Sequence, residues 1–232
     1  MDIDCGGAPL RLLAQRAALL PDRGMLLVAD AHLGKAQSFR RLGVPVPHGT
    51  TDDALARLDA LLAATGARTL VFLGDLLHAA RGRAPAVETA VRRWRECHAA
   101  LELVLVRGNH DHHAGDPPAD WGVRCVDGPW HVGPWALAHH PRPVSGAYVL
   151  AGHVHPAAAL NGSAHQRLRL PCFHLGTGVG VLPAFGGFTG QHVVRPGPGD
   201  RLFVVDGERV HALPATVPPP PLAPPPLTTL AR

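Results

Sequence analysis

Three short apolar segments in the first half of the chain, each ending at polar residues, most constrain its fold. They are Met25–Ala29, Thr69–Leu73 and Leu101–Val106. Between them, Thr51–Ala64 carries leucines on one helical stripe, and Pro85–Ala100 begins with a proline, which favours a first helical turn. Strands that alternate with helices are typical of an α/β layered fold. Ligands of such folds bind at the carboxyl ends of the strands, so we expect the functional site at that edge.

The second half of the chain predicts a second, more antiparallel sheet packed on the first. Its short apolar segments are separated by glycine and proline turns. From Pro214 the chain is rich in proline, which predicts an extended or disordered tail. We therefore expect one domain over residues 1–213 and a tail over residues 214–232. The expected strands are Val123–Val126, Trp130–Val132, Trp135–His139, Tyr148–Ala151, Gln166–Leu170, Cys172–Leu175, Gln191–Val194 and Arg201–Val205.

Composition excludes several classes of protein. Hydrophobic residues make up 46% of the chain, enough for a sizeable core, which excludes a wholly disordered protein. The four cysteines form no C-x-x-C pair, which argues against a structural zinc site and a disulfide framework. No apolar run approaches the ~18 residues of a membrane helix, and no signal peptide is visible, so we expect a cytoplasmic protein with no membrane partner. A net charge of +4 permits a nucleic-acid or phosphate partner without proving one.

Five polar segments at predicted strand ends carry metal-binding side chains. Carboxylate, imidazole and amide ligands without a thiolate suit manganese, iron or zinc. In extended backbone, residues two apart share a face, so Asp30 with His32, and His153 with His155, can each hold metal from one segment. Seven candidates exceed the needs of one ion, which favours two metals that share a carboxylate. The candidate ligands are Asp30, His32, Asp75, Asn109, His139, His153 and His155.

The ordered motifs D-x-H, GD, GNHD, a lone histidine and GHVH resemble the calcineurin-like metallophosphoesterase superfamily over residues 25–156. GDLLH, HHP, and GHVHP followed later by LPAFGGFTG narrow the resemblance to the bacterial ligase-associated DNA damage response endonucleases, over most of residues 3–213. The resemblance implies a four-layer α/β/β/α metallophosphoesterase sandwich, in which two mixed sheets are flanked by helices. It also implies two divalent metal ions, Mn²⁺ first and iron or zinc as alternatives.

The same resemblance implies a role for each motif residue. Asp75 would bridge the two metals. His110 would act near the scissile phosphate as a transition-state stabiliser or general acid. His78 stands where many superfamily members carry an aspartate, fits the subfamily pattern, and is the second candidate catalytic residue, which would contact the phosphate. The first metal would be held by Asp30, His32, Asp75 and His155, and the second by Asp75, Asn109, His139 and His153. His140 competes with His139 for the ligand role, and the subfamily pattern favours His139.

Together these features predict a two-metal phosphodiesterase, in which a metal-bridging hydroxide attacks phosphorus in line with the leaving oxygen. The subfamily resemblance implies that it is a DNA endonuclease of DNA repair, and the mildly basic chain agrees with this expectation. Association with a DNA ligase and a helicase is implied by the resemblance alone. The same site could instead serve a phosphomonoester or a small cyclic or dinucleotide phosphodiester. A non-enzymatic scaffold is the third reading, which the full set of ligands disfavours. The candidate substrate-binding residues are Lys35, Arg81, Arg107 and His140, and Asp111 is expected to be a structural loop residue.

Overall fold

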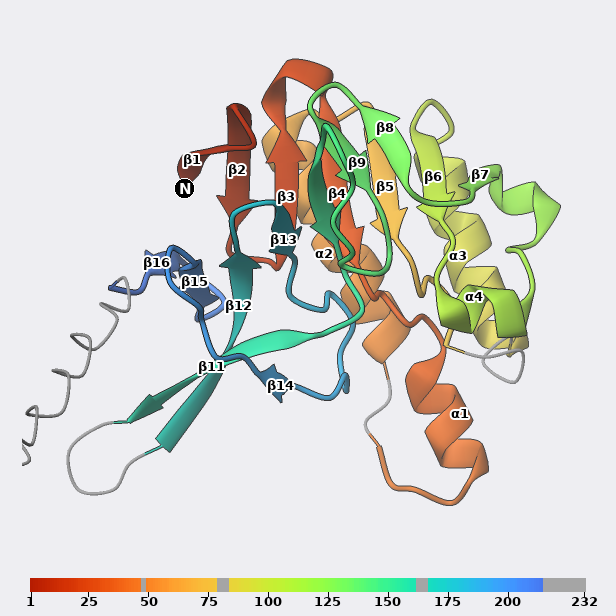
Figure 1. Cartoon of the computed structure of the whole chain (residues 1–232). Helices are drawn as coiled ribbons and strands as arrows, with labels where there is room; N and C mark the ends of the chain where they lie inside the picture. Colours follow the sequence, from red (N-terminus) through yellow and green to blue (C-terminus); the bar gives the residue numbers. More distant parts are fainter. Residues whose placement is uncertain (47–48, 79–83, 162–166, 215–232) are drawn as a thin grey trace, which may run out of the picture.

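The computed structural model describes residues 1–46, 49–78, 84–161 and 167–214 as two stacked β-sheets with helices (Figure 1). Arg81 and the proline-rich tail from residue 215 onward lie outside the described residues. Both sheets are mixed, with parallel and antiparallel pairs. The predicted α/β fold of two mixed sheets with flanking helices is therefore confirmed.

The first sheet has seven strands in sequence order, and its second half is parallel. The strands β1 to β4 pair antiparallel, whereas β4, β5, β6 and β7 pair parallel. Residues 2–20, for which no strand was predicted, form the first three strands of this sheet. The bounds are β1 Asp2–Cys5, β2 Ala8–Leu13, β3 Ala17–Leu20, β4 Met25–Ala29, β5 Thr69–Leu73, β6 Glu102–Val106 and β7 Val123–Val126.

Two long helices, α2 (Thr50–Thr65) and α3 (Pro85–Cys97), cover the outer face of the first sheet (Figure 1). Leu58 of α2 and Trp94 of α3 are buried in this layer with the outward side chains of the sheet. The Trp94 indole donates a hydrogen bond of 2.6 Å to Asp59 and so joins the two helices. Shorter helices follow strand ends: α1 (Lys35–Arg41) after β4 and α4 (Asn109–Ala114) after β6, with 3-10 turns η1 (Pro21–Arg23) and η3 (Ala119–Trp121).

The second sheet has nine strands from the second half of the chain. The two strands predicted over residues 166–175 form one strand, because Pro171 pairs with Ala157 without interrupting it. This strand, β12, and β11 form a hairpin that extends beyond the body of the sheet (Figure 1). The bounds are β8 Trp130–Val132, β9 Trp135–Leu137, β10 Tyr148–Ala151, β11 Pro156–Asn161, β12 Arg167–Leu175, β13 Val179–Val181, β14 His192–Val193, β15 Arg201–Val205 and β16 Val210–Ala212.

Side chains that alternate along the strands of the first sheet create two apolar layers. Leu26 and Val28 of β4 face the helices, whereas Leu27 and Ala29 face the second sheet. The inner layer is completed by side chains such as Phe173, which is fully buried between the sheets. The described residues after η3 form strands and loops and no helix. The described helices are therefore all connected to strands of the first sheet. Among the described residues, no helix is long and apolar enough to cross a membrane.

Candidate metal centre

The parallel strands β4, β5 and β6 end together, which brings their following residues to one edge. Ala29 of β4 is in register with Leu73 of β5, and Leu73 is in register with Val106 of β6. Asp30, Asp75 and Asn109 follow these strand ends, as the sequence predicted. His32 also follows β4, and the second sheet supplies His139, His153 and His155 from the segments after β9 and β10. The site therefore lies where the edges of both sheets meet.

Five of the seven predicted ligands have a left-handed backbone conformation, which few non-glycine residues adopt. Such conformations cluster at functional sites, where surrounding contacts compensate for the strain. Here the carboxylates help to hold the turns, because the backbone N–H of His153 donates to Asp30 and that of His110 donates to Asp75. The φ angles are 52° for Asp30, 45° for His32, 51° for Asp75, 71° for His153 and 52° for His155.

Three glycines leave the space into which the candidate ligands pack. A Cβ at Gly74 would collide with the His139 ring, and one at Gly108 would collide with the Asp75 carboxylate. A Cβ at Gly152 would lie 2.6 Å from Asp30 Oδ2, which is too close for any real contact. The glycine of each GD, GN and GH motif is thus required by the close approach of a ligand side chain.

The first group of candidate ligands is Asp30, His32 and His155, whose ligand atoms lie within 4.8 Å of one another. His155 Nε2 lies 3.5 Å from Asp30 Oδ1, while its Nδ1 bonds the Gly190 carbonyl at 3.1 Å. Burial lowers the pKa of His32 to about 2, and nearby Lys35 and histidines add to the shift. His32 is therefore a neutral imidazole, which is the form that binds metal.

The second group surrounds His139 Nε2. This atom lies 2.9 Å from Asn109 Oδ1, 3.0 Å from His153 Nδ1 and 3.5 Å from Asp75 Oδ1. The other ring nitrogen of His139 donates to the Leu73 carbonyl at 3.1 Å, so the neutral ring presents a lone pair at Nε2. Lone pairs of nitrogen and oxygen thus converge at roughly the 3–3.5 Å spacing of neighbouring ligands on one ion.

Asp75 lies between the two groups. Its Oδ2 is 3.9 Å from His32 Nε2, and its Oδ1 faces His139. Asp30 is 0% exposed and Asp75 is 2% exposed, and Asp30 Oδ1 has no hydrogen-bond partner among the described residues. Burial and the neighbouring Asp30 raise the pKa of Asp75. Two buried carboxylates with so few donors are costly unless cations neutralise them, so these residues fit a divalent-metal site.

His110 and His78 lie beside the His32 ring, at centroid distances of 5.2 and 5.4 Å. His110 Nδ1 bonds the His78 carbonyl at 2.8 Å, which leaves Nε2 free, 4.0 Å from Asp75 Oδ2. The two rings stack at a centroid distance of 5.1 Å, and Phe39 of α1 stacks on the other side of His78 at 6.0 Å. Burial lowers the pKa of His78 to about 4, so its ring is neutral. The contact by Phe39 was not predicted, because nothing in the sequence marks it.

Asp111 joins the GNHD segment to the GDLL segment, in agreement with its predicted structural role. Its Oδ2 accepts hydrogen bonds from the backbone N–H groups of Asp75 at 2.7 Å and Gly108 at 2.9 Å. Its Oδ1 accepts from those of Leu76 at 3.0 Å and Leu77 at 3.3 Å. One buried carboxylate therefore fixes the two turns that present Asp75 and Asn109.

The predicted substrate-binding residues differ in their surroundings. Lys35 begins α1 and is half-buried near both carboxylates, and burial lowers its pKa. The Arg107 guanidinium hydrogen-bonds Asp116 at 2.8 and 2.9 Å and Asp127 at 2.9 Å, which raises its pKa. His140 lies beside His139 and His153, and all three rings could reach one ion. Arg81 lies outside the described residues.

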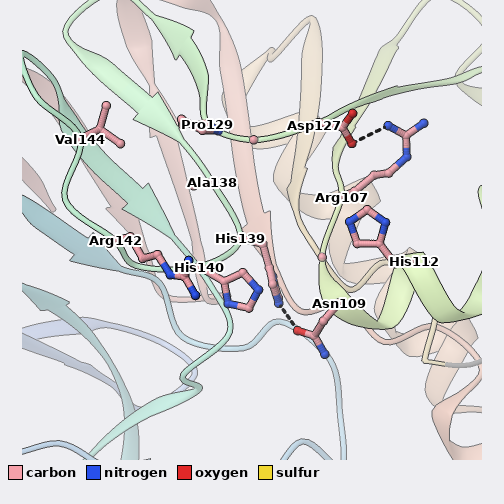
Figure 2. A pocket seen from close by; sticks show the side chains of 12 residues that line it. Arg107, Asn109, His112, Asp127, Pro129, Ala138, His139, His140, Arg142 and Val144 are labelled. Atoms are coloured by element: carbon pink, nitrogen blue, oxygen red, sulfur yellow. Dashed lines mark hydrogen bonds and ion pairs between the residues drawn. The ribbon is translucent and has the colours of Figure 1, made fainter.

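A cavity of about 530 Å³ adjoins the second group of ligands (Figure 2). Asn109 and His139 line one end, and His112, Asp127 and Arg142 line the walls. The sequence pattern did not single out Arg142. Its position directly after the HHP motif was the signal that could have found it.

Comparison with known proteins places the chain in a family. The family model for the calcineurin-like phosphoesterase matches residues 25–138. The Pseudomonas putida nuclease MPE, known from a crystal structure, is 47% identical in sequence to this chain. The alignment covers 92% of this chain and 99% of the nuclease, and the two structures superpose with a TM-score of 0.82. The chain therefore belongs to the calcineurin-like phosphoesterases, and it is a metal-dependent phosphoesterase.

A second solved structure is more distant. Yfce, a phosphoesterase from E. coli, is 19% identical, with coverage of 80% of this chain and 95% of that chain and a TM-score of 0.40. Comparison with curated proteins found no significant match.

Proposed function

We propose that this phosphoesterase is a two-metal phosphodiesterase that cleaves DNA internally. The observation that carries the proposal is the pair of ligand groups that meet at Asp75. In this assignment the first ion is held by Asp30, His32, Asp75 and His155, and the second by Asp75, Asn109, His139 and His153. The nuclease named among the similar structures supports a nucleic acid as the substrate, and the subfamily resemblance of the motifs favours DNA.

Divalent ions bound at these ligands would supply an activated water and would neutralise the charge of the phosphate. The protein's own groups orient the rest of the reaction. The carbonyls of Leu73 and Gly190 fix the rings of His139 and His155, so that Nε2 of each faces the centre. The His110 side chain is 39% exposed, so its Nε2 can reach a bound substrate and donate a proton to the leaving oxygen. His78 holds the His110 ring through its carbonyl.

We further propose that Mn²⁺ is the preferred metal, with iron or zinc as alternatives, because the ligand set contains hard oxygens and imidazoles and no thiolate. A role in DNA repair in the cytoplasm, in association with a DNA ligase and a helicase, rests on the subfamily resemblance of the GDLLH, HHP and GHVHP motifs.

The proposal is tested on the chelated enzyme, supplied in turn with Mn²⁺, Mg²⁺ and Zn²⁺. Supercoiled plasmid, linear duplex, single-stranded DNA, bis-p-nitrophenyl phosphate and p-nitrophenyl phosphate are the substrates. We expect metal-dependent nicking of plasmid or internal cleavage of single strands, and hydrolysis of the diester. Activity confined to the monoester would exclude the nuclease and leave a phosphomonoesterase.

The proton-donor role of His110 predicts a loss that depends on the leaving group. For His110→Ala we expect kcat on DNA to fall by ~10²–10⁴-fold, because the departing DNA oxygen needs a proton. The loss on bis-p-nitrophenyl phosphate should be at least tenfold smaller, because nitrophenolate leaves without protonation. His131→Ala, an exposed histidine of β8, is the matched control. Equal losses on both substrates would assign His110 to binding instead of proton transfer.

A further inference from the structure

The cavity beside the second ligand group is built from both sheets and is open to water. The segment after β6 and helix α4 form one wall, and the segment after β9 forms the other (Figure 2). His112, Pro129 and Arg142 line it and are exposed to solvent. Its volume of about 530 Å³ lies within the range of small-molecule sites and suits one nucleotide unit.

The charges in this cavity are unevenly distributed. Arg107 is neutralised by its bonds with Asp116 and Asp127. Arg142, in contrast, makes no side-chain hydrogen bond or ion pair within the described part of the chain. Its side chain is exposed and lies beside the His140 ring (Figure 2). A hydrogen bond of 2.9 Å from the backbone N–H of Arg142 to the His140 carbonyl holds the main chain at this position. One unpaired guanidinium therefore remains within the cavity.

The remaining lining suits a nucleoside. Pro129, Ala138 and Val144 provide an apolar surface, and the imidazoles of His112 and His140 stand on opposite sides (Figure 2). Flat rings and apolar side chains accept the face of a base without selecting its sequence. A guanidinium forms paired hydrogen bonds with a phosphate.

From these observations we propose that the cavity binds the nucleotide next to the scissile linkage, and that Arg142 binds the neighbouring phosphodiester. The inference rests on the proposed nuclease function. It adds a second site of contact with the substrate, next to the scissile phosphate. Arg142 is a substrate-binding residue that touches the strand one linkage away from the reacting phosphorus. The site then recognises a polymer, since a phosphomonoester has no neighbouring phosphate.

The test uses end-labelled single strands in which one linkage is an uncharged methylphosphonate. We expect the wild-type enzyme to cut one of the two adjacent linkages about tenfold more slowly than in an unmodified strand, because the contact with Arg142 is lost. Arg142→Ala should cut the unmodified strand about tenfold more slowly, mainly through KM, and the neutral linkage should cause no further loss. Arg142→Lys should recover part of the activity, since it keeps the charge.

Arg209→Ala is the matched control, because Arg209 is also exposed and directly precedes β16. It should retain the wild-type response to the neutral linkage. The inference is overturned if the neutral linkage slows neither adjacent cut in the wild type, or if Arg142→Ala keeps the wild-type sensitivity. If the wild type cuts no DNA while it hydrolyses small esters, the proposed function fails and the inference fails with it.

Discussion

Asp75→Asn should abolish metal-dependent hydrolysis, with a fall in kcat of ~10³-fold or more. In the proposed site this carboxylate is shared by both ligand groups, since its two oxygens face His32 and His139. A metal contributes several kcal/mol of transition-state stabilisation, and about 4 kcal/mol corresponds to ~10³-fold in rate. The amide keeps the shape of the side chain, so the loss reports the missing charge. The measurements are kcat on bis-p-nitrophenyl phosphate and bound metal by mass spectrometry.

The same variant should behave differently when metal is absent. Asp30 and Asp75 are buried beside each other, and removing one charge relieves their repulsion. Chelated Asp75→Asn should therefore melt at or above the temperature of the chelated wild type, while added Mn²⁺ should raise its melting temperature less. Asp120→Asn, on an exposed aspartate paired with Arg92, is the control. A variant that binds two metal equivalents and keeps full activity would refute the bridging assignment.

Asp111→Asn should cause the largest loss of stability that a single isosteric change produces near the site. Each oxygen of this buried carboxylate accepts two backbone N–H groups, and an amide would turn one acceptor into a donor. Leaving two buried donors unpaired costs about 3 kcal/mol, or about 10 °C in melting temperature for a chain of this size. Denaturant unfolding and thermal melting measure this loss.

The activity of Asp111→Asn should fall as well, because the turns that carry Asp75 and Asn109 lose their common acceptor. Asp120→Asn again supplies the control, since an exposed ion pair contributes at most about 1 kcal/mol. An unchanged melting temperature for Asp111→Asn would show that the four hydrogen bonds contribute nothing to folding.

The sequence predicted the parallel strands well and the first sheet's edge poorly. β4 and β5 begin and end where expected, because each is an apolar run bounded by polar residues. Thr51–Ala64 corresponds to α2, which extends one residue further at each end and is capped by Gly66 in the left-handed conformation. The first three strands were not predicted. β3 is the uniform apolar run Ala17–Leu20, which has no periodicity that would mark a strand. In β2, by contrast, buried Leu10 and Leu12 alternate with exposed Arg11, and this pattern could have indicated a strand.

The site was more predictable than its surroundings. The motifs named the residues that the fold assembles, because each motif follows a strand whose end lies at the shared edge. Helix α4 could not be found in the same way, since the segment NHDHHA has no apolar stripe and is held by Asp111. The position of Arg142 directly after the HHP motif could have marked it as a candidate, but the cavity that it lines depends on how a loop of the second sheet faces α4, which no local pattern encodes.

The left-handed backbone at five proposed ligands also restricts which amino acids this edge can accept. Aspartate, asparagine and histidine enter that conformation more readily than other side chains, and β-branched residues enter it hardly at all. They are also the side chains that bind hard and borderline metals. At Asp30, His32, Asp75, His153 and His155 the requirements of the main chain and of coordination chemistry therefore select from the same short set. In a saturation library at these positions, we expect most substitutions to be lost in a selection for folding, and most of the remainder to be lost in a selection for activity.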